Sequence, residues 1–293
     1  MPDIALAAEI PDSLDDGTGG RLEARYGQAF GGLGVQAARQ AGAHWNPVLD
    51  TLLDHRSVRN FLSRPLPLGA LQVVVAAAQS APSSSNMQAW SVVAVELPER
   101  KAELAQLCGG QKHIAQAPIF LVWVADLARH AAIAQAQGAP TEGLDYLETF
   151  LTAAIDVGLA AQNAVGALEA LGLGCVYIGA VRNRPEAVAE FLQLPPHAAP
   201  ILGLCVGWPN PETPTAVKPR LPQSAVLHSE TYDRDQLGRV NGYDETLRAF
   251  QNGQGLKAAG WTPSVMAKVA NGEVLNGRDR LSAALKRLGF PLR

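Results

Sequence analysis

The stretch that most constrains the fold of this chain runs over about residues 143–171. Leucine and isoleucine recur there at helical spacing, alanine and glycine fill many of the positions between them, and Gly172 follows as a C-cap. Such a helix is roughly 40 Å long. Because the stretch carries little charge after Asp156, most of its circumference must be buried. A single small sheet can hardly cover so much surface, so we favour a partner subunit over the alternative, the central helix of a large monomer.

Short apolar runs before and after this helix predict the strands of a sheet. They lie at 91–95, 119–124, 175–178 and 201–206. The runs are apolar on both faces, which is typical of strands that are covered on both sides of a sheet. Two further helical patterns, at 49–53 and 69–78, precede the first run.

The ends of the chain differ from its middle. Residues 1–45 have weak periodicity and a Gly/Asp-rich patch, so we expect a partly disordered N-terminal extension there. We expect the main domain at 46–232, where the strands and the strongest helices lie. Residues 233–293 are more charged and contain two weak helical patterns, which indicates a helical C-terminal excursion of the same domain.

Composition disfavours several classes of protein. The 293 residues carry 24 Lys and Arg against 27 Asp and Glu, whereas a general nucleic-acid-binding protein would show a basic excess. Cys108, Cys175 and Cys205 lie far apart and outside any Cys/His cluster, so we expect no metal site, no disulfide framework and a cytoplasmic location. No unbroken apolar run approaches the ~18 residues of a membrane span, so we expect no membrane partner.

Two short strings concentrate positive charge. One is His55-Arg56-Ser57-Val58-Arg59, after the first helical pattern, and the other is Lys218-Pro219-Arg220, in a proline-rich segment. Arginine and hydroxyl side chains are common phosphate ligands. Alternation along an extended chain would point Lys218 and Arg220 the same way. The two strings can converge on one phosphate, or each can be a solvated basic loop.

Two other segments offer groups for the edge and face of a heteroaromatic ring. Residues 83–88 supply hydroxyl and amide groups between a helix and a strand, although such loops often only turn the chain. Residues 172–180 end a strand in small residues, which let a planar ligand lie close to the backbone N–H groups. The alternative for these glycines is a tight turn between helix and strand.

In their order and spacing these segments resemble the nitroreductase family of FMN flavoproteins, and within it the oxygen-insensitive NADPH nitroreductase and flavin reductase branch. The resemblance covers about 49–232. It rests on His55-Arg-Ser-Val-Arg59, Ser83-Ser-Ser85 with Gln88, Gly109-Gly-Gln-Lys-His113, Gly172-Leu-Gly-Cys-Val-Tyr-Ile-Gly179 with Arg182-Asn183, and Lys218-Pro-Arg-Leu-Pro222. Each string alone is weak, but five of them in this order form a specific pattern.

The resemblance implies a fold, an assembly and a set of FMN-binding residues. The fold would be an α+β sandwich in which helices flank a mixed sheet, built as an intertwined homodimer with two FMN sites at the interface. The phosphate would be held by His55, Arg56, Ser57, Lys218 and Arg220. Arg59 would lie near N1 and O2 of the flavin ring, Gln111 at its pyrimidine edge, and the backbone of Tyr177, Ile178 and Gly179 beside N5. Ser83, Ser84, Ser85 and Gln88 would come from the other subunit.

The implied activity is a ping-pong transfer of hydride from NADPH to FMN and then to a small acceptor, such as a nitroaromatic or a quinone. No side chain is implied as a nucleophile or metal ligand, because the flavin carries the chemistry. One alternative is a dedicated NADPH-flavin oxidoreductase that supplies free reduced flavin. Another is an FMN-binding protein without catalytic activity.

Overall fold

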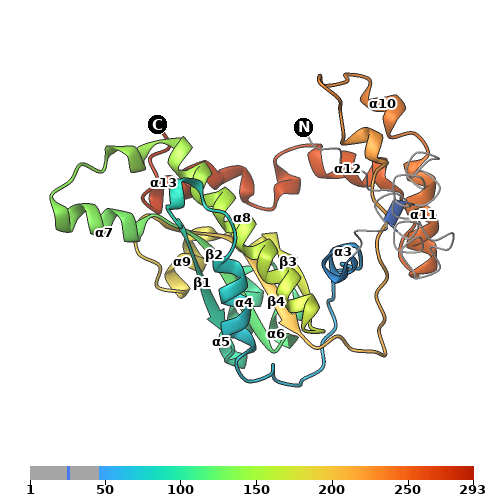
Figure 1. The fold of residues 1–293 in the computed structure, drawn as a ribbon, viewed down its shortest axis with the longest axis horizontal. Coiled ribbons are helices and arrows are strands. Elements are labelled where there is room, and N and C mark those ends of the chain that lie inside the picture. Colours follow the sequence, from blue (N-terminus) through green and yellow to red (C-terminus); the bar gives the residue numbers. More distant parts are fainter. Residues whose placement is uncertain (1–24, 27–45) are drawn as a thin grey trace, which may run out of the picture. The chain divides into compact units, whose positions relative to one another are not determined.

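The computed structural model describes Arg25, Tyr26 and residues 46–293. The chain divides into two compact units, which are described separately (Figure 1). The helical unit comprises Met1–Arg56 and Ala216–Ala267, and the sheet unit comprises Ser57–Thr215 and Lys268–Arg293. The predicted extension at 1–45 lies outside the described residues except for Arg25 and Tyr26, which belong to the helical unit.

The predicted strands are all present, each slightly longer than the apolar run that indicated it. They are β1 (Trp90–Val95), β2 (Ile119–Asp126), β3 (Gly174–Ile178) and β4 (Ala198–Gly207). The α-helices are α3 (Pro47–Leu53), α4 (Ala70–Gln79), α5 (Pro98–Leu107), α6 (Lys112–Gln116), α7 (Ala128–Gln137), α8 (Leu147–Ala170), α9 (Pro185–Phe191), α10 (Gln236–Arg239), α11 (Tyr243–Gly253), α12 (Trp261–Val269) and α13 (Leu281–Arg287). Short 3-10 turns are η3 (Ser84–Asn86), η4 (Glu142–Asp145), η5 (Gly179–Arg182), η6 (Gln223–Ala225), η7 (Glu273–Leu275) and η8 (Arg278–Arg280).

The sheet of the sheet unit has four strands in the order β1-β2-β4-β3. Neighbouring strands in this order run antiparallel. The expected mixed sheet is therefore present in the described residues only through an isolated parallel bridge between Ser57 and Cys175 on β3. Ser57 lies outside the four strands and contacts β3 through this single bridge, so no ladder sets its direction. Each pair of neighbouring strands, in contrast, is held antiparallel by a full ladder of backbone hydrogen bonds.

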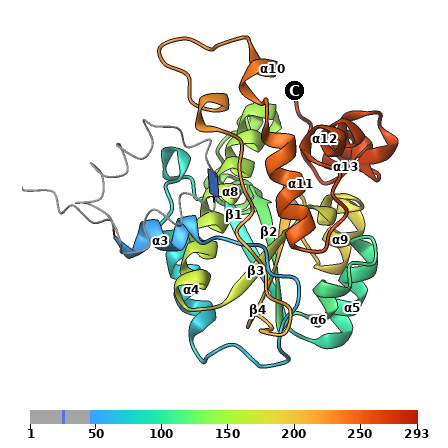
Figure 2. The same ribbon diagram turned by 90° about the vertical axis from the view of Figure 1, so that its right-hand side faces the viewer.

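The central strand β2 shows why its sequence is apolar at consecutive positions. Its residues from Ile119 to Ala125 are all buried, and alternate side chains belong to two different cores. Leu121 and Trp123 pack with residues of α4 and α8, whereas Phe120 and Val122 pack with residues of α5, α6 and α9. Figure 2 shows these two helical layers on opposite faces of the sheet. Since successive strand side chains point to opposite faces, a strand covered on both sides must be apolar throughout.

The long helix α8 begins at Leu147, later than the predicted 143, because η4 ends at Asp145 and Tyr146 is extended. One face of α8 packs on the sheet. Its opposite side carries Leu147, Leu151, Ile155 and Leu159, which are 53%, 49%, 53% and 39% exposed. The sheet unit therefore leaves part of the circumference of α8 uncovered, as an apolar stripe at helical spacing.

By length and composition α8 could also cross a membrane, with a mean hydropathy of 1.3 over 18 residues. The sequence shows no unbroken apolar run there, because Asp156, Gln162 and Asn163 interrupt it, while the leucine, isoleucine, valine and alanine residues around them keep the mean high. Ala153, Val157, Ala160, Val165 and other residues of α8 are buried against the rest of the sheet unit. This is the position of a core helix.

The three cysteines are buried and are not paired in disulfides, as predicted. Burial raises the pKa of Cys108 and Cys175 to about 12, and it raises the pKa of Cys205 as well. These thiols therefore stay protonated near neutral pH and serve as small apolar side chains.

Candidate functional site

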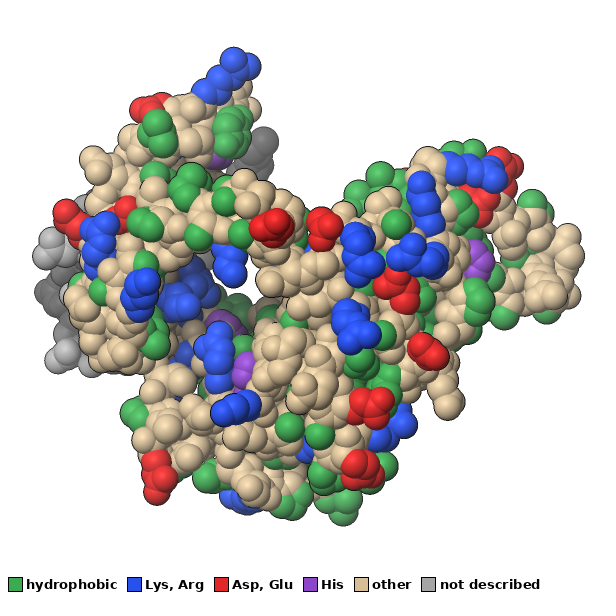
Figure 3. All heavy atoms as spheres, turned by 180° about the vertical axis from the view of Figure 1, so that it is seen from behind, with side chains coloured by type: hydrophobic (Ala, Val, Ile, Leu, Met, Phe, Trp, Pro, Cys, Tyr) green, Lys and Arg blue, Asp and Glu red, His purple; other side chains and the backbone are tan. Residues whose placement is uncertain are grey.

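The helical unit holds the start of the first cationic string and the whole of the second. His55 and Arg56 follow the end of α3, and Lys218-Pro219-Arg220 lies in the extended segment before η6. Lys218 and Arg220 are exposed, whereas Pro219 between them is buried, in agreement with the alternation expected from the sequence. Basic side chains are exposed on both units, with acidic and apolar ones among them (Figure 3).

A buried arginine joins these two strings. The guanidinium of Arg25 donates hydrogen bonds to the carbonyl oxygens of Leu53 at 2.7 Å and His55 at 2.9 Å through one nitrogen. Its other terminal nitrogen donates to the carbonyl oxygen of Lys218 at 3.1 Å. The Arg220 N–H donates in turn to the Arg25 carbonyl at 2.8 Å. Residues separated by more than 160 positions are thus tied together inside one unit.

Tyr243, the first residue of α11, holds the middle of the second string. Its buried hydroxyl donates to the Pro219 carbonyl at 2.8 Å. Burial raises the pKa of Tyr243, although the nearby positive charge of Arg220 acts to lower it, so the hydroxyl remains a donor. Each residue of Lys218-Pro219-Arg220 therefore has its backbone anchored to a distant side chain or backbone group.

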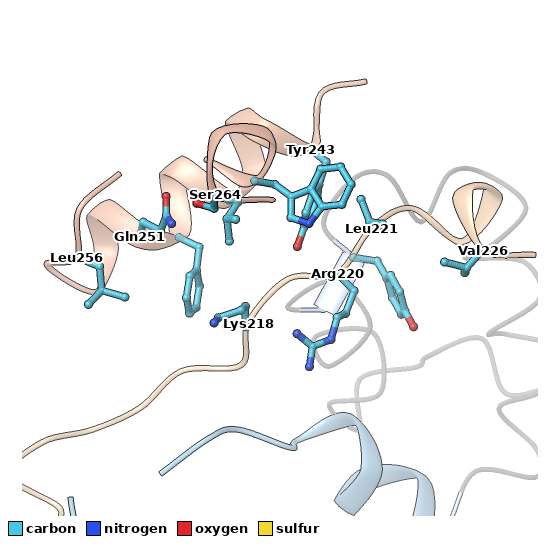
Figure 4. Close-up of a pocket in the computed structure, with 12 residues that line it drawn as sticks. Lys218, Arg220, Leu221, Val226, Tyr243, Gln251, Leu256 and Ser264 are labelled. Atoms are coloured by element: carbon cyan, nitrogen blue, oxygen red, sulfur yellow. The ribbon is translucent and has the colours of Figure 1, made fainter. Parts of the chain in front are cut away.

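A cavity of about 640 Å³ lies beside this segment within the helical unit (Figure 4). Its lining is largely apolar and aromatic, from Tyr26, Leu221, Val226, Tyr243, Leu247, Phe250, Leu256 and Trp261, with Gln251 and Ser264 as polar members. Lys218 and Arg220 also line it, and Figure 4 shows both on the side away from the helices that carry Tyr243 and Ser264. Two cations therefore border an apolar cavity.

The rest of the first string lies in the sheet unit, against β3. Ser57 forms the parallel bridge to Cys175, and the Val58 N–H donates to the Cys175 carbonyl at 2.9 Å. Val58 is buried on Gly174, where an added Cβ would lie only 2.7 Å from a Val58 methyl carbon. Residue 174 must therefore be glycine for Val58 to approach β3 this closely. A tight turn between helix and strand, the alternative given above, does not account for this glycine.

Arg59 lies near the segment that contains Gln111. The pKa of His113 is lowered, first by burial and second by the positive charge of Arg59. The Gln111 side-chain amide donates to the Cys108 carbonyl at 3.2 Å. Arg59 is therefore close enough to His113, in the 109–113 string, for its charge to act there.

The end of β3 is open at Gly179. A Cβ there would lie 3.3 Å from a terminal nitrogen of Arg182 and 3.8 Å from one of Arg278. The pKa of Arg182 is lowered, first by its burial and second by the charge of Arg278, so the two guanidinium groups are close to each other. Glycine at 179 leaves the backbone of this positively charged corner uncovered.

The polar loop at 83–88 is held by one carboxylate, that of Asp156 on α8. Asp156 is only 1% exposed. Its oxygens accept hydrogen bonds from the Ser83 hydroxyl at 2.6 Å, from the Ser84 N–H at 3.1 Å and from the Ala89 N–H at 3.4 Å. The Ser83 oxygen also accepts from the Gln88 N–H at 2.7 Å, which closes the loop on itself.

This loop contains three residues other than glycine with left-handed backbone, namely Ser85 (φ 49°), Asn86 (φ 55°) and Gln88 (φ 50°). Each costs on the order of 1 kcal/mol. Contacts from α7 hold the loop from outside, because Arg129 donates to the Gln88 carbonyl at 3.1 Å. Ser84, Ser85 and Gln88 are exposed, so the anchored loop presents its polar groups outward.

The residues of each unit fit one part of FMN. The helical unit has exposed cations at a set spacing, which suit a phosphate. The sheet unit has guanidinium and amide donors and an uncovered glycine backbone, which suit the edge of a flavin ring. Two of its buried polar atoms, His113 Nε2 and Asn183 Oδ1, have no hydrogen-bond partner in the part of the chain that the structure describes. Such atoms call for a polar ligand or water nearby.

The side chains that anchor these segments are not among the residues predicted from the sequence. The sequence does indicate an anchoring role for Asp156, because a carboxylate in a mainly apolar helix is seldom buried without hydrogen-bond donors around it. Nothing in the sequence indicates such a role for Arg25, because it lies in a stretch of weak periodicity far from both strings. Tyr243, Phe250 and Trp261 of the cavity lie in the tail, where only weak helices were predicted, and Tyr26 lies in the N-terminal stretch.

Comparisons with known proteins agree with this architecture. The model of the Nitroreductase family matches residues 52–208. This chain belongs to the nitroreductase family. The model of the family's C-terminal domain matches residues 218–293, so Arg25 lies outside both matched ranges.

Other members of the nitroreductase family are similar over most of their length. The chain is 40% identical to an FMN reductase [NAD(P)H] of Bacillus subtilis over 225 residues, which cover 75% of this chain and 90% of the relative. It is 40% identical to an oxygen-insensitive NADPH nitroreductase of Salmonella typhimurium over 207 residues, covering 70% and 82%. The solved structure of B. megaterium NfrA2 superposes with a TM-score of 0.80 at 35% identity, covering 85% of this chain and all of that one.

Proposed function

We propose that the protein binds FMN and uses NADPH to reduce small acceptors such as nitroaromatics and quinones. The observation that carries the proposal is the joining of the two cationic strings, since the carbonyls of His55 and Lys218 accept hydrogen bonds from one guanidinium. Exposed cations at a set spacing are what a phosphate requires. The similarity to an FMN reductase [NAD(P)H] and to an NADPH nitroreductase supports FMN as the ligand and NADPH as the donor.

At the phosphate end, His55, Arg56 and Ser57 with Lys218 and Arg220 would bind the dianion. Lys218 and Arg220 are exposed on an anchored backbone, so binding a ligand would not carry the cost of ordering this segment. Arginine can meet two phosphate oxygens with two N–H groups, and lysine adds a compact charge.

At the ring end, Arg59 would stabilise negative charge at N1 and O2, and Gln111 would bind the pyrimidine edge. The backbone of Tyr177, Ile178 and Gly179 would lie beside the ring, where glycine at 179 adds no side chain. Ser83, Ser84, Ser85 and Gln88 of the anchored loop would contribute from a second subunit. Bound FMN supplies the transfer of hydride between donor and acceptor, so no side chain needs to act as a nucleophile.

The apolar stripe on α8 supports a homodimer, which we propose as the assembly of this cytoplasmic protein. Leu147, Leu151, Ile155 and Leu159 follow one another at intervals of four residues on a helix whose opposite face is buried. Covering large leucine side chains that are half exposed is favourable at about 25 cal/mol per Å². A second subunit that covers this stripe would be the partner that the sequence of the long helix predicts.

The first test is the absorbance spectrum of the purified protein, recorded without oxygen before and after NADPH is added. We expect flavin bands that bleach with NADPH and return when a nitroaromatic or a quinone is added. Bands that NADPH does not bleach would favour a binding protein without this activity. A colourless protein that takes up no added FMN would contradict the proposal.

A flavin reductase is the second candidate, favoured by the 40% identity to an FMN reductase [NAD(P)H]. It would use the same FMN-binding residues but accept a second flavin as its substrate. Steady-state rates with free FMN and with a nitroaromatic, measured at the same NADPH concentration, separate the two. A higher kcat/KM for free FMN would assign the protein to flavin reduction.

A further inference from the structure

We infer that Arg25 is a positioning residue for the phosphate site, which it assembles by fixing the spacing between the His55 and Lys218 strings. The inference rests on the proposed function, in which these two strings bind the FMN phosphate. Arg25 lies outside the ranges that match the family models. This chain therefore supplies part of the support for its site from an N-terminal segment.

The geometry of the Arg25 side chain suits this role. One terminal nitrogen lies 2.7 Å from the Leu53 oxygen and 2.9 Å from the His55 oxygen, and the other lies 3.1 Å from the Lys218 oxygen. A guanidinium is planar and rigid, so its two ends set the separation of the groups that they bind. The Arg25 donors named here bind the backbone oxygens of His55 and Lys218, so they fix the backbone of both strings.

The Arg25 backbone adds a fourth contact, because its carbonyl accepts from the Arg220 N–H at 2.8 Å. The second string is therefore tied to Arg25 on both sides of Pro219. Arg25 also satisfies the Leu53 carbonyl at the end of α3, one of the groups that a helix leaves without an intrahelical partner.

Burial strengthens the contribution of the Arg25 hydrogen bonds. Arg25 is 4% exposed, so water cannot easily replace the hydrogen bonds that its guanidinium makes. Hydrogen bonds from a charged donor are roughly twice as strong as neutral ones. Removing the side chain would leave three carbonyl oxygens without this donor and would free the two strings to move independently.

A comparison of two ligands separates positioning of the phosphate site from a general structural role. FMN and riboflavin share the ring, but only FMN has a phosphate. We expect Arg25→Ala to raise the Kd of the apoprotein for FMN by about tenfold or more, the size of one charge-assisted hydrogen bond. The Kd for riboflavin should change by less than about twofold, within the usual effect of a substitution away from the ring.

Three variants serve as controls. Arg25→Lys keeps the charge without the rigid fork, so it should recover only part of the FMN affinity. Tyr243→Phe removes one neutral hydrogen bond from the same segment and should have a smaller effect than Arg25→Ala. Arg234→Ala removes an exposed charge from the same unit and should leave both Kd values unchanged.

The outcomes also distinguish this inference from the proposed function. If the wild-type protein binds FMN no more tightly than riboflavin, the proposed phosphate site is wrong whatever Arg25 does. If the wild type prefers FMN but Arg25→Ala changes both Kd values by the same factor, or neither, the positioning role is overturned. Full recovery in Arg25→Lys would also overturn it. Should Arg25→Ala fail to fold, Arg25→Lys gives the same comparison.

Discussion

The loop at 83–88 and the two cationic strings are organised by opposite means. In the sheet unit a buried carboxylate, Asp156, accepts hydrogen bonds from the hydroxyl and N–H groups of the loop. In the helical unit a buried guanidinium, Arg25, donates to the carbonyl groups of two segments. Each anchor is at most 4% exposed and lies far along the chain from what it holds.

The difference lies in what fixes the anchor itself. Asp156 sits on α8, whose neighbouring residues Ala153, Val157 and Ala160 are completely buried, so packing determines its position before the loop forms. Arg25 is fixed chiefly by the groups that it holds, since its side chain and its own backbone bind the same two segments. We therefore expect loss of Asp156 to reduce the stability of the whole sheet unit and loss of Arg25 to act mainly on ligand affinity.

The largest effect should follow Asp156→Ala. This change leaves the Ser83 hydroxyl and the Ser84 and Ala89 N–H groups without their acceptor. At about 1 kcal/mol or more for each unsatisfied buried donor, the free energy of unfolding should fall by roughly 3 kcal/mol. Urea unfolding measures it, with Glu148→Ala on the exposed part of the same helix as the control. Equal stability of the two variants would remove Asp156 as the anchor.

The next effect concerns a ligand group rather than an anchor. Arg220→Ala should weaken FMN binding by roughly 1.5–3 kcal/mol, the value of a charge-assisted hydrogen bond. Isothermal titration of the apoprotein gives the Kd, and Lys257→Ala, an exposed charge of the same unit, is the matched control. An unchanged FMN affinity would take Arg220 out of the proposed site. The string at 218–220 in the helical unit would then have no ligand-binding role through Arg220 to compare with the loop at 83–88.

A smaller effect should follow Ser83→Ala. The hydroxyl donates to Asp156 and accepts from the Gln88 N–H, so its removal breaks a chain of two hydrogen bonds. We expect a loss of about 1–2 kcal/mol in the free energy of unfolding. In the double variant with Asp156→Ala the two losses should not add, because both act on the same network. Full additivity would show that Asp156 and the loop are independent.

The smallest effect is expected at an exposed ion pair, Glu186 with Arg287. Burial acts to raise the pKa of Glu186, but hydrogen bonding and the charge of Arg287 outweigh it, so the pKa lies below its ordinary value. The pair therefore stabilises the fold above the unfolded pKa of about 4.3, and this contribution is lost as the pH falls through the lower folded value. Glu186→Gln should cost at most about 1 kcal/mol at pH 7 and nothing at pH ~2.

Urea unfolding at the two pH values checks this, with Glu190→Gln on the same helix as the control. A loss at pH 7 as large as that of Asp156→Ala would show that burial is not what distinguishes the anchors from surface pairs.

Most of the sheet unit could be predicted from the sequence. The consecutive apolar runs indicated strands covered on both faces, and β2 is buried on both. The strings at 55–59 and 218–220 were recognised as ligand-binding candidates because their residue types are costly anywhere except at a surface or a site. The start of α8 was predicted less well, because the sequence pattern does not reveal that η4 ends at Asp145 and that Tyr146 is extended.

The sequence by itself determined which segments carry phosphate-binding and ring-binding chemistry, since that chemistry depends on residue type and local spacing. Only the tertiary structure decided what holds these segments in place. The anchors Arg25, Asp156 and Tyr243 lie 24 to 193 positions from these partners and, apart from the Ser83 hydroxyl, bind backbone groups, which every residue has. Because a backbone oxygen or N–H leaves no mark in the sequence, even a carboxylate that must have donors, such as Asp156, does not reveal which groups supply them.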